Sequence, residues 1–260
     1  MNKVTDQIGR EVEILEGPAR IISLVPSQTE LLSDLGLEEE VIGITKFCVH
    51  PEKWFKEKIK VGGTKKLKLE KIRELNPDFI IANKEENTRE QVDTLAKEFP
   101  VWVSDVKTLG DAYDMINQVG VIVGKSDSAS SLLKSIKEEF EKLNPRPPFP
   151  RTAYLIWQKP LMTIGNDTFI NSLLRNAGFE NIFSSRQRYP VITMQDLKAD
   201  CEILLLPSEP FPFSEKHRKT WSRYLPGTKV ILVDGQYFSW YGSRLVKAPA
   251  YFSSIWSNLS

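Results

Sequence analysis

Residues 31–38 have the sequence Leu-Leu-Ser-Asp-Leu-Gly-Leu-Glu, and residues 173–180 have the sequence Leu-Leu-Arg-Asn-Ala-Gly-Phe-Glu. In each copy, apolar residues at helical spacing stop at a glycine, which is typical of a helix that ends there. The similarity continues downstream, where Leu-Glu-Lys-Ile at 69–72 and Met-Gln-Asp-Leu at 194–197 each precede an apolar strand pattern. The repeat predicts two similar α/β lobes, and a cleft between such lobes is a common binding site for a small molecule.

Short apolar runs alternate with amphipathic segments around both copies of the repeat. Continuous apolar runs separated by helices indicate a parallel sheet that is covered on both faces, so we expect two Rossmann-like lobes with parallel sheets. The expected strands are 20–25, 41–44, 79–82, 101–103, 152–157, 202–206 and 229–233. The expected helices are 29–35, 69–75, 88–99, 169–177, 215–224 and a closing segment near 250–259.

The stretch from 111 to 143 lacks a strand signal and is interrupted once, near Gly124. From about Ser126 its apolar residues form one stripe, which predicts a helix of ~27 Å at 1.5 Å per residue. The proline-dense run 144–150 then ends this helix. We therefore predict an N-terminal lobe over 1–118, a single long helix and connector over 119–150, and a C-terminal lobe over 151–260.

Composition excludes several classes of protein. The 260 residues include 35 basic and 34 acidic side chains, and this net charge of +1 does not indicate a nucleic-acid or anionic-membrane partner. Apolar runs are shorter than the roughly 18–20 residues that span a bilayer, and the first residues do not resemble a signal peptide. We therefore expect a soluble chain as it stands, and we expect its two cysteines, Cys48 and Cys201, to be buried free thiols.

Motifs for catalysis are absent from the sequence. It has no Gly-x-Ser-x-Gly elbow, no Walker phosphate loop and no dinucleotide glycine motif, and two histidines are too few for a three-histidine zinc site. Cys48 and His50 are either a pair of soft metal ligands or ordinary loop residues before a proline. Ser27 and His50 could be a nucleophile and its base, but no third residue that would orient the base can be identified. We expect His217 to be a solvated helix residue, and residues 61–64 to form a simple turn.

Aromatic side chains follow several of the expected strands, and the carboxyl ends of parallel strands form the edge that faces ligands. These aromatic residues are Phe47 and Trp54, Trp157, Phe211 and Phe213, and Tyr237, Phe238, Trp240 and Tyr241. Because the rings at 237–241 lie in one loop and are hard to bury together, they favour a large flat or macrocyclic ligand. Arg244 is either a partner for a carboxylate, phosphate or amide oxygen of that ligand or a structural surface residue.

Five segments of the first lobe resemble the helical-backbone metal-receptor family of substrate-binding proteins, which serve ABC importers of cobalamin, haem and iron–siderophore. These segments are residues 20–32, Gly36, 41–43, 69–72 and 76–80, and residues 165–170 through 178–183 resemble the matching motif of the second lobe. The resemblance covers roughly residues 7–256. It is strongest to the cobalamin binders, because of the Ser-Leu-Val-Pro-Ser-Gln-Thr-Glu opening, the Phe-Cys-Val-His-Pro segment and the aromatic loop that ends at Ser243-Arg244.

The resemblance implies a non-enzymatic protein with no catalytic cofactor and no resident metal, which carries a corrinoid to an importer permease as an extracytoplasmic monomer. It implies that Glu70 and its counterpart in the second lobe dock on permease arginines; that counterpart falls on Gln195, with Asp196 beside it. Lys65 and Lys66 stand where cobalamin binders tend to have a tryptophan-containing loop. The candidate ligand-binding residues are Pro26, Ser27, Phe47, Lys65, Trp157, Gln158, Phe211, Phe213, Trp240, Tyr241 and Arg244.

Two alternatives stay open at this point. An iron–siderophore or haem ligand is anionic and would use lysines, of which Lys46, Lys65, Lys66 and Lys159 are candidates. A cytosolic enzyme or cofactor-handling protein could use the same fold, because fold does not determine function. We expect His50 not to coordinate the metal of a bound corrinoid.

Overall fold

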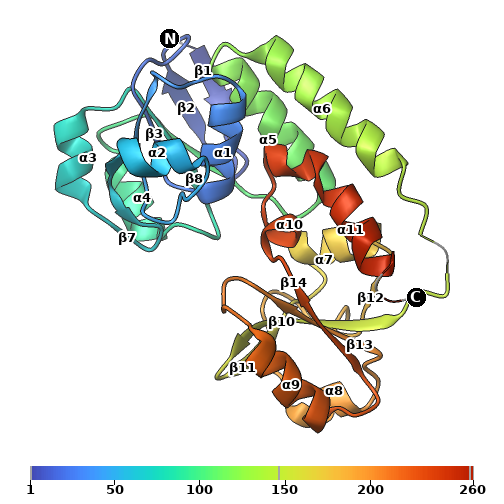
Figure 1. Ribbon diagram of the computed structural model, residues 1–260. Helices are drawn as coiled ribbons and strands as arrows, with labels where there is room; N and C mark the ends of the chain where they lie inside the picture. The colour runs from blue at the N-terminus through green and yellow to red at the C-terminus, as the bar shows by residue number, and fades with distance from the viewer. Residues whose placement is uncertain (1, 146, 258, 260) are drawn as a thin grey trace. The chain divides into compact units, whose positions relative to one another are not determined.

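The computed structural model describes residues 2–145, 147–257 and 259, and Figure 1 shows the arrangement of their helices and strands. The chain forms two compact units, each with its own sheet. The N-terminal unit comprises Met1–Val106, Gly110–Ile136 and Tyr241–Arg244, and the C-terminal unit comprises Lys107–Leu109, Lys137–Trp240 and Leu245–Ser260. Both units are therefore discontinuous in sequence, in contrast to the three contiguous ranges that the sequence analysis predicts.

The N-terminal unit is built on a parallel sheet of five strands in the order β5-β4-β3-β8-β9. Every residue of β3, β8 and β9 is buried, as expected for strands that are covered on both faces. The predicted α/β class with parallel strands is confirmed. The strands are β3 (Ile21–Ser23), β4 (Val41–Ile44), β5 (Ile59–Lys60), β8 (Phe79–Asn83) and β9 (Val101–Ser104).

Six helices and two small hairpins complete this unit. The helices are α1 (Pro26–Asp34), α2 (Glu52–Glu57), α3 (Leu69–Leu75), α4 (Arg89–Leu95), α5 (Leu109–Ile122) and α6 (Ser126–Glu141), the ends of α5 and α6 belonging to the other unit. One hairpin, β1 (Asn2–Thr5) with β2 (Glu11–Ile14), is absent from the sequence prediction. The other pairs β6 (Gly62–Gly63) with β7 (Lys66–Leu67), so the expectation of a simple turn at 61–64 is wrong. The long helix predicted from Ser126 is α6.

The sequence repeat has the same backbone geometry in both units. Gly36 follows α1 with φ 79° and Gly178 follows α7 (Phe169–Asn176) with φ 84°, a left-handed conformation that glycine adopts without steric cost. In each copy the next residue donates its N–H five positions back, Leu37 to the carbonyl of Leu32 at 3.1 Å and Phe179 to that of Leu174 at 2.9 Å. The repeat therefore encodes a Schellman helix end in each unit.

The sheet of the C-terminal unit has the order β11-β10-β13-β14, with β12 also paired to β10. Its strands are parallel except β11, which forms a hairpin with β10 that the sequence analysis missed. The strands are β10 (Arg151–Gln158), β11 (Leu161–Thr163), β12 (Glu180–Asn181), β13 (Ile203–Pro207) and β14 (Lys229–Val233). The remaining helices are α8 (Met194–Lys198), α9 (Glu215–Tyr224), α10 (Gln236–Ser239), the 3₁₀ helix η1 (Ser243–Val246), which spans both units, and α11 (Ala248–Ser257).

In the parts of the chain that the structure describes, no helix combines the length and the apolar character that crossing a membrane requires.

Candidate functional site

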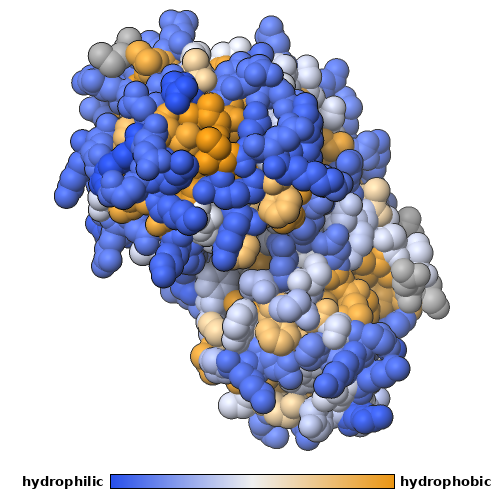
Figure 2. Space-filling view, turned by 60° about the vertical axis from the view of Figure 1, so that its left-hand side comes forward, coloured by the Kyte–Doolittle hydropathy of each residue, from blue (hydrophilic) through white to orange (hydrophobic). Residues whose placement is uncertain are grey.

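Two of the aromatic side chains predicted to contact a ligand are exposed at the protein surface. On the face that Figure 2 shows, hydrophobic surface lies in patches bounded by hydrophilic side chains. Among the large apolar side chains of the described residues, Phe47 is 50% exposed and Trp157 is 41% exposed. Both stand among the residues that the sequence predicts to contact a ligand.

Phe47 lies on the loop after β4, against the β6–β7 hairpin. A Cβ atom added to Gly63 would lie 3.0 Å from the Phe47 ring, so the missing side chain makes room for the ring. The backbone N–H of Lys46 donates to the carbonyl of Gly62 at 2.8 Å, and the Lys46 Nζ lies 5.1 Å from the centre of the Phe47 ring. This corner of the N-terminal unit therefore presents an aromatic face with a cation on it.

Lys65 lies at the tip of the same hairpin and is exposed. Its Nζ donates to the backbone carbonyl of Glu85, and its own carbonyl accepts from the hydroxyl of Thr88 at 3.0 Å. Lys65 is therefore held by the segment between β8 and α4. The N-terminal unit brings Phe47 and Lys65 to neighbouring loops.

The start of α1 is covered by residues from the far end of the chain. Ser27 is 4% exposed, and a Cβ atom on Gly242 would lie 2.5 Å from its carbonyl oxygen. Arg244 donates through Nε and Nη2 to the two carboxylate oxygens of Glu30 at 2.9 and 2.6 Å. The structure thus brings Ser27, Tyr241 and Arg244 together in the N-terminal unit, with the guanidinium of Arg244 in a bidentate ion pair.

A buried polar cluster behind α1 was missed by the sequence analysis. The Gln28 side-chain amide donates to the Ser104 hydroxyl at 2.7 Å, and Asn83 donates to the same hydroxyl at 2.9 Å. The Gln28 Oε1 atom is buried and has no hydrogen-bond partner among the described residues. A signal was present, because Asn83 and Ser104 directly follow apolar strand runs, where polar side chains reach the sheet edge that faces ligands.

The thiol of Cys48 lies in the core of the N-terminal unit. It is fully buried, with the hydroxyls of Thr29 and Thr45 at 3.0 and 3.1 Å from its sulfur, and burial raises its pKa. Among the described residues no group of three or more His, Cys, Asp and Glu side chains is placed to hold a metal ion. Both cysteines are buried and free, which confirms that expectation.

In the C-terminal unit, Trp157 belongs to a cluster of aromatic side chains. Its ring centre lies 5.5 Å from that of Phe211, which lies 4.7 Å from Phe213. The His217 ring contacts both phenylalanines edge-on at 5.3 and 5.6 Å, and its Nδ1 accepts from the backbone N–H of Ser214 at 3.0 Å. His217 is therefore a helix residue, as the sequence suggests, but it is half-buried and takes part in the cap of α9.

Gln158 is the last residue of β10 and pairs with Leu161 in the β10–β11 hairpin. The indole N–H of Trp157 donates to the carbonyl of Lys159 at 3.0 Å, which fixes the ring at this hairpin. Pro26 is half-buried in the first turn of α1. These residues therefore lie at strand ends or at a helix start, as a ligand-facing edge requires.

Three of the four rings between 237 and 241 are buried and Tyr237 is half-buried, so the expectation that these rings resist burial is wrong. Phe238 is fully buried against Tyr154 and Phe252, whose ring centres lie 5.4 and 4.8 Å away. Trp240 and Tyr241 are each 6% exposed. Their packing partners lie far away in sequence, which is why the local pattern could not reveal the burial.

The two predicted docking residues differ in their surroundings. Glu70 is exposed at the start of α3, where Arg73 binds its carboxylate at 2.5 Å. Asp196 accepts from the backbone N–H of Thr193 at 2.7 Å and from Arg186 at 2.8 Å. Hydrogen bonds from the Thr193 backbone and hydroxyl, followed by the ion pair with Arg186, hold the pKa of Asp196 below its usual value. Asp196 thus caps α8, whereas Gln195 is exposed.

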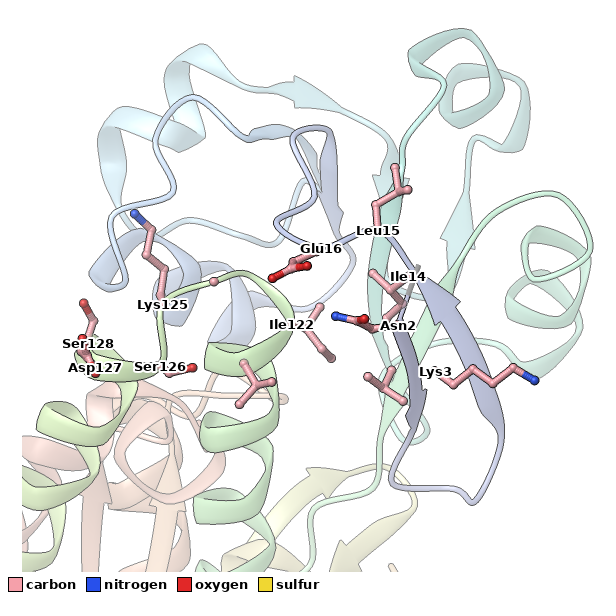
Figure 3. Close-up of a pocket in the computed structure, with 13 residues that line it drawn as sticks. Asn2, Lys3, Ile14, Leu15, Glu16, Ile122, Lys125, Ser126, Asp127 and Ser128 are labelled. Carbon is pink, nitrogen blue, oxygen red and sulfur yellow. The ribbon is translucent and has the colours of Figure 1, made fainter.

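The N-terminal unit also contains a groove of about 670 Å³ between the β1–β2 hairpin and the turn that joins α5 to α6. Figure 3 shows Asn2 and Ile14 on the hairpin side, and Ile122 and the first residues of α6 on the other. None of the candidate ligand-binding residues lines this groove.

Three comparisons relate this chain to known proteins. The sequence profile of the periplasmic binding protein family matches residues 21–205. An ABC transporter substrate-binding lipoprotein, YvrC of Bacillus subtilis, is 28% identical over 183 residues, which is 66% of this chain and 57% of that protein, so the match spans less than two thirds of that relative. A vitamin B12-binding protein of Pectobacterium carotovorum is 26% identical over 251 residues, which is 94% of this chain and 90% of that protein.

Solved structures share the fold at lower identity. The periplasmic vitamin B12 binding protein BtuF of Vibrio cholerae has a TM-score of 0.74 and 20% identity, over 94% of this chain and 98% of that chain. The periplasmic haem binding protein HutB of Vibrio cholerae has a TM-score of 0.77 and 19% identity, over 91% of this chain and 98% of that chain. Because proteins with different ligands match equally well, these structures support the fold and do not discriminate between ligands.

Proposed function

Because the chain belongs to the periplasmic binding protein family, we propose that it is the substrate-binding component of an ABC importer and that its ligand is a corrinoid of the cobalamin type. Membership in this family confirms the resemblance that the sequence motifs carry, and it confirms the prediction of a binding protein and not an enzyme. The names of the relatives, one a lipoprotein and one a periplasmic protein, support an extracytoplasmic location.

The observation that carries the ligand proposal is the pair of exposed rings at strand ends, Phe47 on the N-terminal unit and Trp157 on the C-terminal unit. A corrin is a large macrocycle that offers flat apolar faces, and aromatic side chains bind such faces with a large contact area and few lost rotamers. The vitamin B12-binding name of a relative that aligns over 94% of the chain supports the same ligand class.

Calorimetric titration with cobinamide, cyanocobalamin, haem and a ferric siderophore tests the ligand class. We expect stoichiometric binding of a corrinoid without turnover. Heat with the siderophore and none with either corrinoid would reject the corrinoid.

Two matched pairs of variants test the rings. Phe47→Ala and Trp157→Ala should each weaken corrinoid binding by about 1–2 kcal/mol, because each removes one ring contact. The controls are Phe55→Ala and Tyr224→Ala, which remove exposed rings from α2 and α9. Equal affinities for the test and control variants would place both rings outside the site.

The second candidate ligand is an anionic chelate such as an iron–siderophore or haem. The lysine cation on the Phe47 ring and the neighbouring Lys65 favour it, because cations attract anionic ligands over a long range. This candidate predicts an affinity that falls steeply between low and high salt, whereas binding by ring contacts changes little.

We also propose that Glu70 contacts an importer permease, through a carboxylate that acts mainly on association rate and on the rim of the interface. Glu70→Gln should weaken association with the cognate permease and reduce its salt dependence, while corrinoid affinity is unchanged. Glu74→Gln is the matched control, since Glu74 is an exposed carboxylate on the same helix.

On the C-terminal unit the proposed docking residue is Asp196, which also caps α8. Asp196→Asn should therefore weaken permease association only if the charge of Asp196 contributes to docking. Gln195→Ala is the control, because it changes the exposed residue next to Asp196 without changing a charge. If Glu70→Gln and Asp196→Asn both leave association unchanged, the docking proposal fails and the ligand proposal stands by itself.

A further inference from the structure

Residues 235–244, which we call the crossing segment, connect the two units near the end of the chain. The segment follows β14 and contains α10, and Trp240 is its last residue in the C-terminal unit. Tyr241–Arg244 belong to the N-terminal unit. Two of the rings that the sequence predicts to contact a ligand, Trp240 and Tyr241, therefore lie on either side of the boundary.

On the C-terminal unit, Glu209 holds the first half of the segment. One carboxylate oxygen of Glu209 accepts from the indole N–H of Trp240 at 2.9 Å and from the hydroxyl of Ser239 at 2.7 Å. A Cβ atom on Gly235 would lie 2.9–3.1 Å from three atoms of Glu209, so the backbone of the segment lies directly on this residue. Glu209 therefore fixes both the backbone and the orientation of the Trp240 ring.

On the N-terminal unit, Glu30 holds the second half in the same way. The bidentate bond from Arg244 to Glu30 leaves these side chains only 12% and 19% exposed. As at Gly235, there is no room for a side chain at Gly242, where an added Cβ atom would lie 2.5 Å from the carbonyl oxygen of Ser27. Each half of the segment is thus held by one glycine in close contact and one carboxylate that accepts two hydrogen bonds.

We propose that Glu209 and Glu30 are positioning residues, which set the place of Trp240 and Tyr241 for ligand binding without contacting the ligand themselves. The ligand half of this inference rests on the proposed function. Because the indole N–H of Trp240 is already bonded and the residue is only 6% exposed, a ligand would contact the small exposed part of the ring and not its N–H group. Charge-assisted, two-fold hydrogen bonds are the interactions best suited to hold a side chain in one orientation.

Variants of Glu209 test the first half. Glutamine keeps a carbonyl oxygen that accepts both hydrogen bonds, whereas alanine removes the acceptor. We expect Glu209→Ala to shift the ¹⁵N–¹H indole signal of Trp240, assigned by its loss in Trp240→Phe, and to weaken cobinamide binding about tenfold. Glu209→Gln should restore the affinity to within about threefold. Glu215→Ala, which removes an exposed carboxylate of the same unit, is the control.

An unmoved Trp240 signal in Glu209→Ala overturns the role of Glu209, and so does an affinity in Glu209→Gln as low as in Glu209→Ala. If the wild-type protein binds no corrinoid, the proposed ligand is wrong. The indole signal then still decides whether Glu209 positions Trp240, so the two failures are distinguishable.

A double-mutant cycle tests the second half. If Glu30 and Arg244 act only on each other, then Glu30→Gln, Arg244→Gln and the double variant should weaken cobinamide binding to the same extent, within about twofold. Glu13→Gln, at an exposed carboxylate of the same unit, should have no effect. A loss in Arg244→Gln that exceeds the loss in Glu30→Gln by tenfold would show that Arg244 contacts the ligand directly and would overturn the positioning role of Glu30.

Discussion

Gly242→Ala tests whether the crossing segment depends on a close backbone contact. A Cβ atom at this position would lie 2.5 Å from the carbonyl oxygen of Ser27 and 3.3 Å from the Cβ of Leu31. The first distance is far below van der Waals contact, and the atom that it meets belongs to the backbone of α1, which cannot rotate away as a side chain can. Overpacking of this kind typically costs about 1–3 kcal/mol of unfolding free energy.

Gly227→Ala is the matched control. Nothing lies within 4 Å of the Cβ position at Gly227, so the same substitution there should leave stability unchanged or raise it by about 0.4–1 kcal/mol through the unfolded state. Urea unfolding followed by tryptophan fluorescence measures both, since Trp54 and Trp102 lie in the core of the N-terminal unit and Trp221 lies in the core of the C-terminal unit, which contains Gly227. If the two variants agree in unfolding free energy within about 0.5 kcal/mol, residue 242 does not lie against α1 as described. The second half of the crossing segment would then be held by the Arg244–Glu30 ion pair alone.

Three further predictions concern titration and packing. Burial raises the pKa of both thiols, that of Cys201 to about 11. Cys48 and Cys201 should therefore be protonated at pH 8 and should react with a disulfide reagent only after denaturant is added. Stoichiometric reaction of the native protein would contradict this expectation. Because the pKa of Asp196 is lower in the folded state than its unfolded value near 3.8, ionised Asp196 stabilises the fold at pH values above 3.8. The stability difference between wild type and Asp196→Asn should therefore be present at pH 6 and vanish as the pH falls through the folded pKa. A difference in urea midpoint that does not change with pH would refute this prediction. Phe179 is 1% exposed and stacks on Trp256 at 5.0 Å, so Phe179→Ala should cost about 3–5 kcal/mol by thermal or urea unfolding, and a loss below 1 kcal/mol would show that the site collapses around the cavity.

Long elements with strong periodicity could be predicted from the sequence. The expected helix 215–224 and strand 229–233 agree with α9 and β14, and the helix start at Ser126 agrees with α6. Helix α6 has an apolar stripe and β14 has an apolar run, whereas α9 buries only Trp221 and is marked by the capping residue Ser214 at its start; local signals decide such elements. The hairpin of β1 and β2 was missed because its strands are four residues long and mostly exposed, so they lack the apolar pattern of a covered strand.

The candidate site was harder to predict because its partners are distant in sequence. Trp240 and Arg244 could be identified as candidates from the sequence. Their hydrogen bonds to Glu209 and Glu30, however, join residues that are 31 and 214 positions apart in sequence, and no local pattern predicts such pairs. The burial of Phe238 depends on Tyr154, and the polar cluster of Gln28 depends on Ser104, for the same reason. Residue types at strand ends could be predicted, whereas their exposure could not.

The return of residues 241–244 to the N-terminal unit also determines when that unit can be complete. Its sheet and helices are encoded before residue 137, yet Gly242 and Arg244, which cover α1, are made only after nearly the whole C-terminal unit. Contacts across such a sequence separation form late, because the intervening chain must close a very long loop first. A nascent chain that ends before residue 244 therefore leaves the first turn of α1 uncovered and the Glu30 carboxylate without the Arg244 guanidinium. Quality control that acts during synthesis would therefore meet an incomplete N-terminal unit until the last helix is being made.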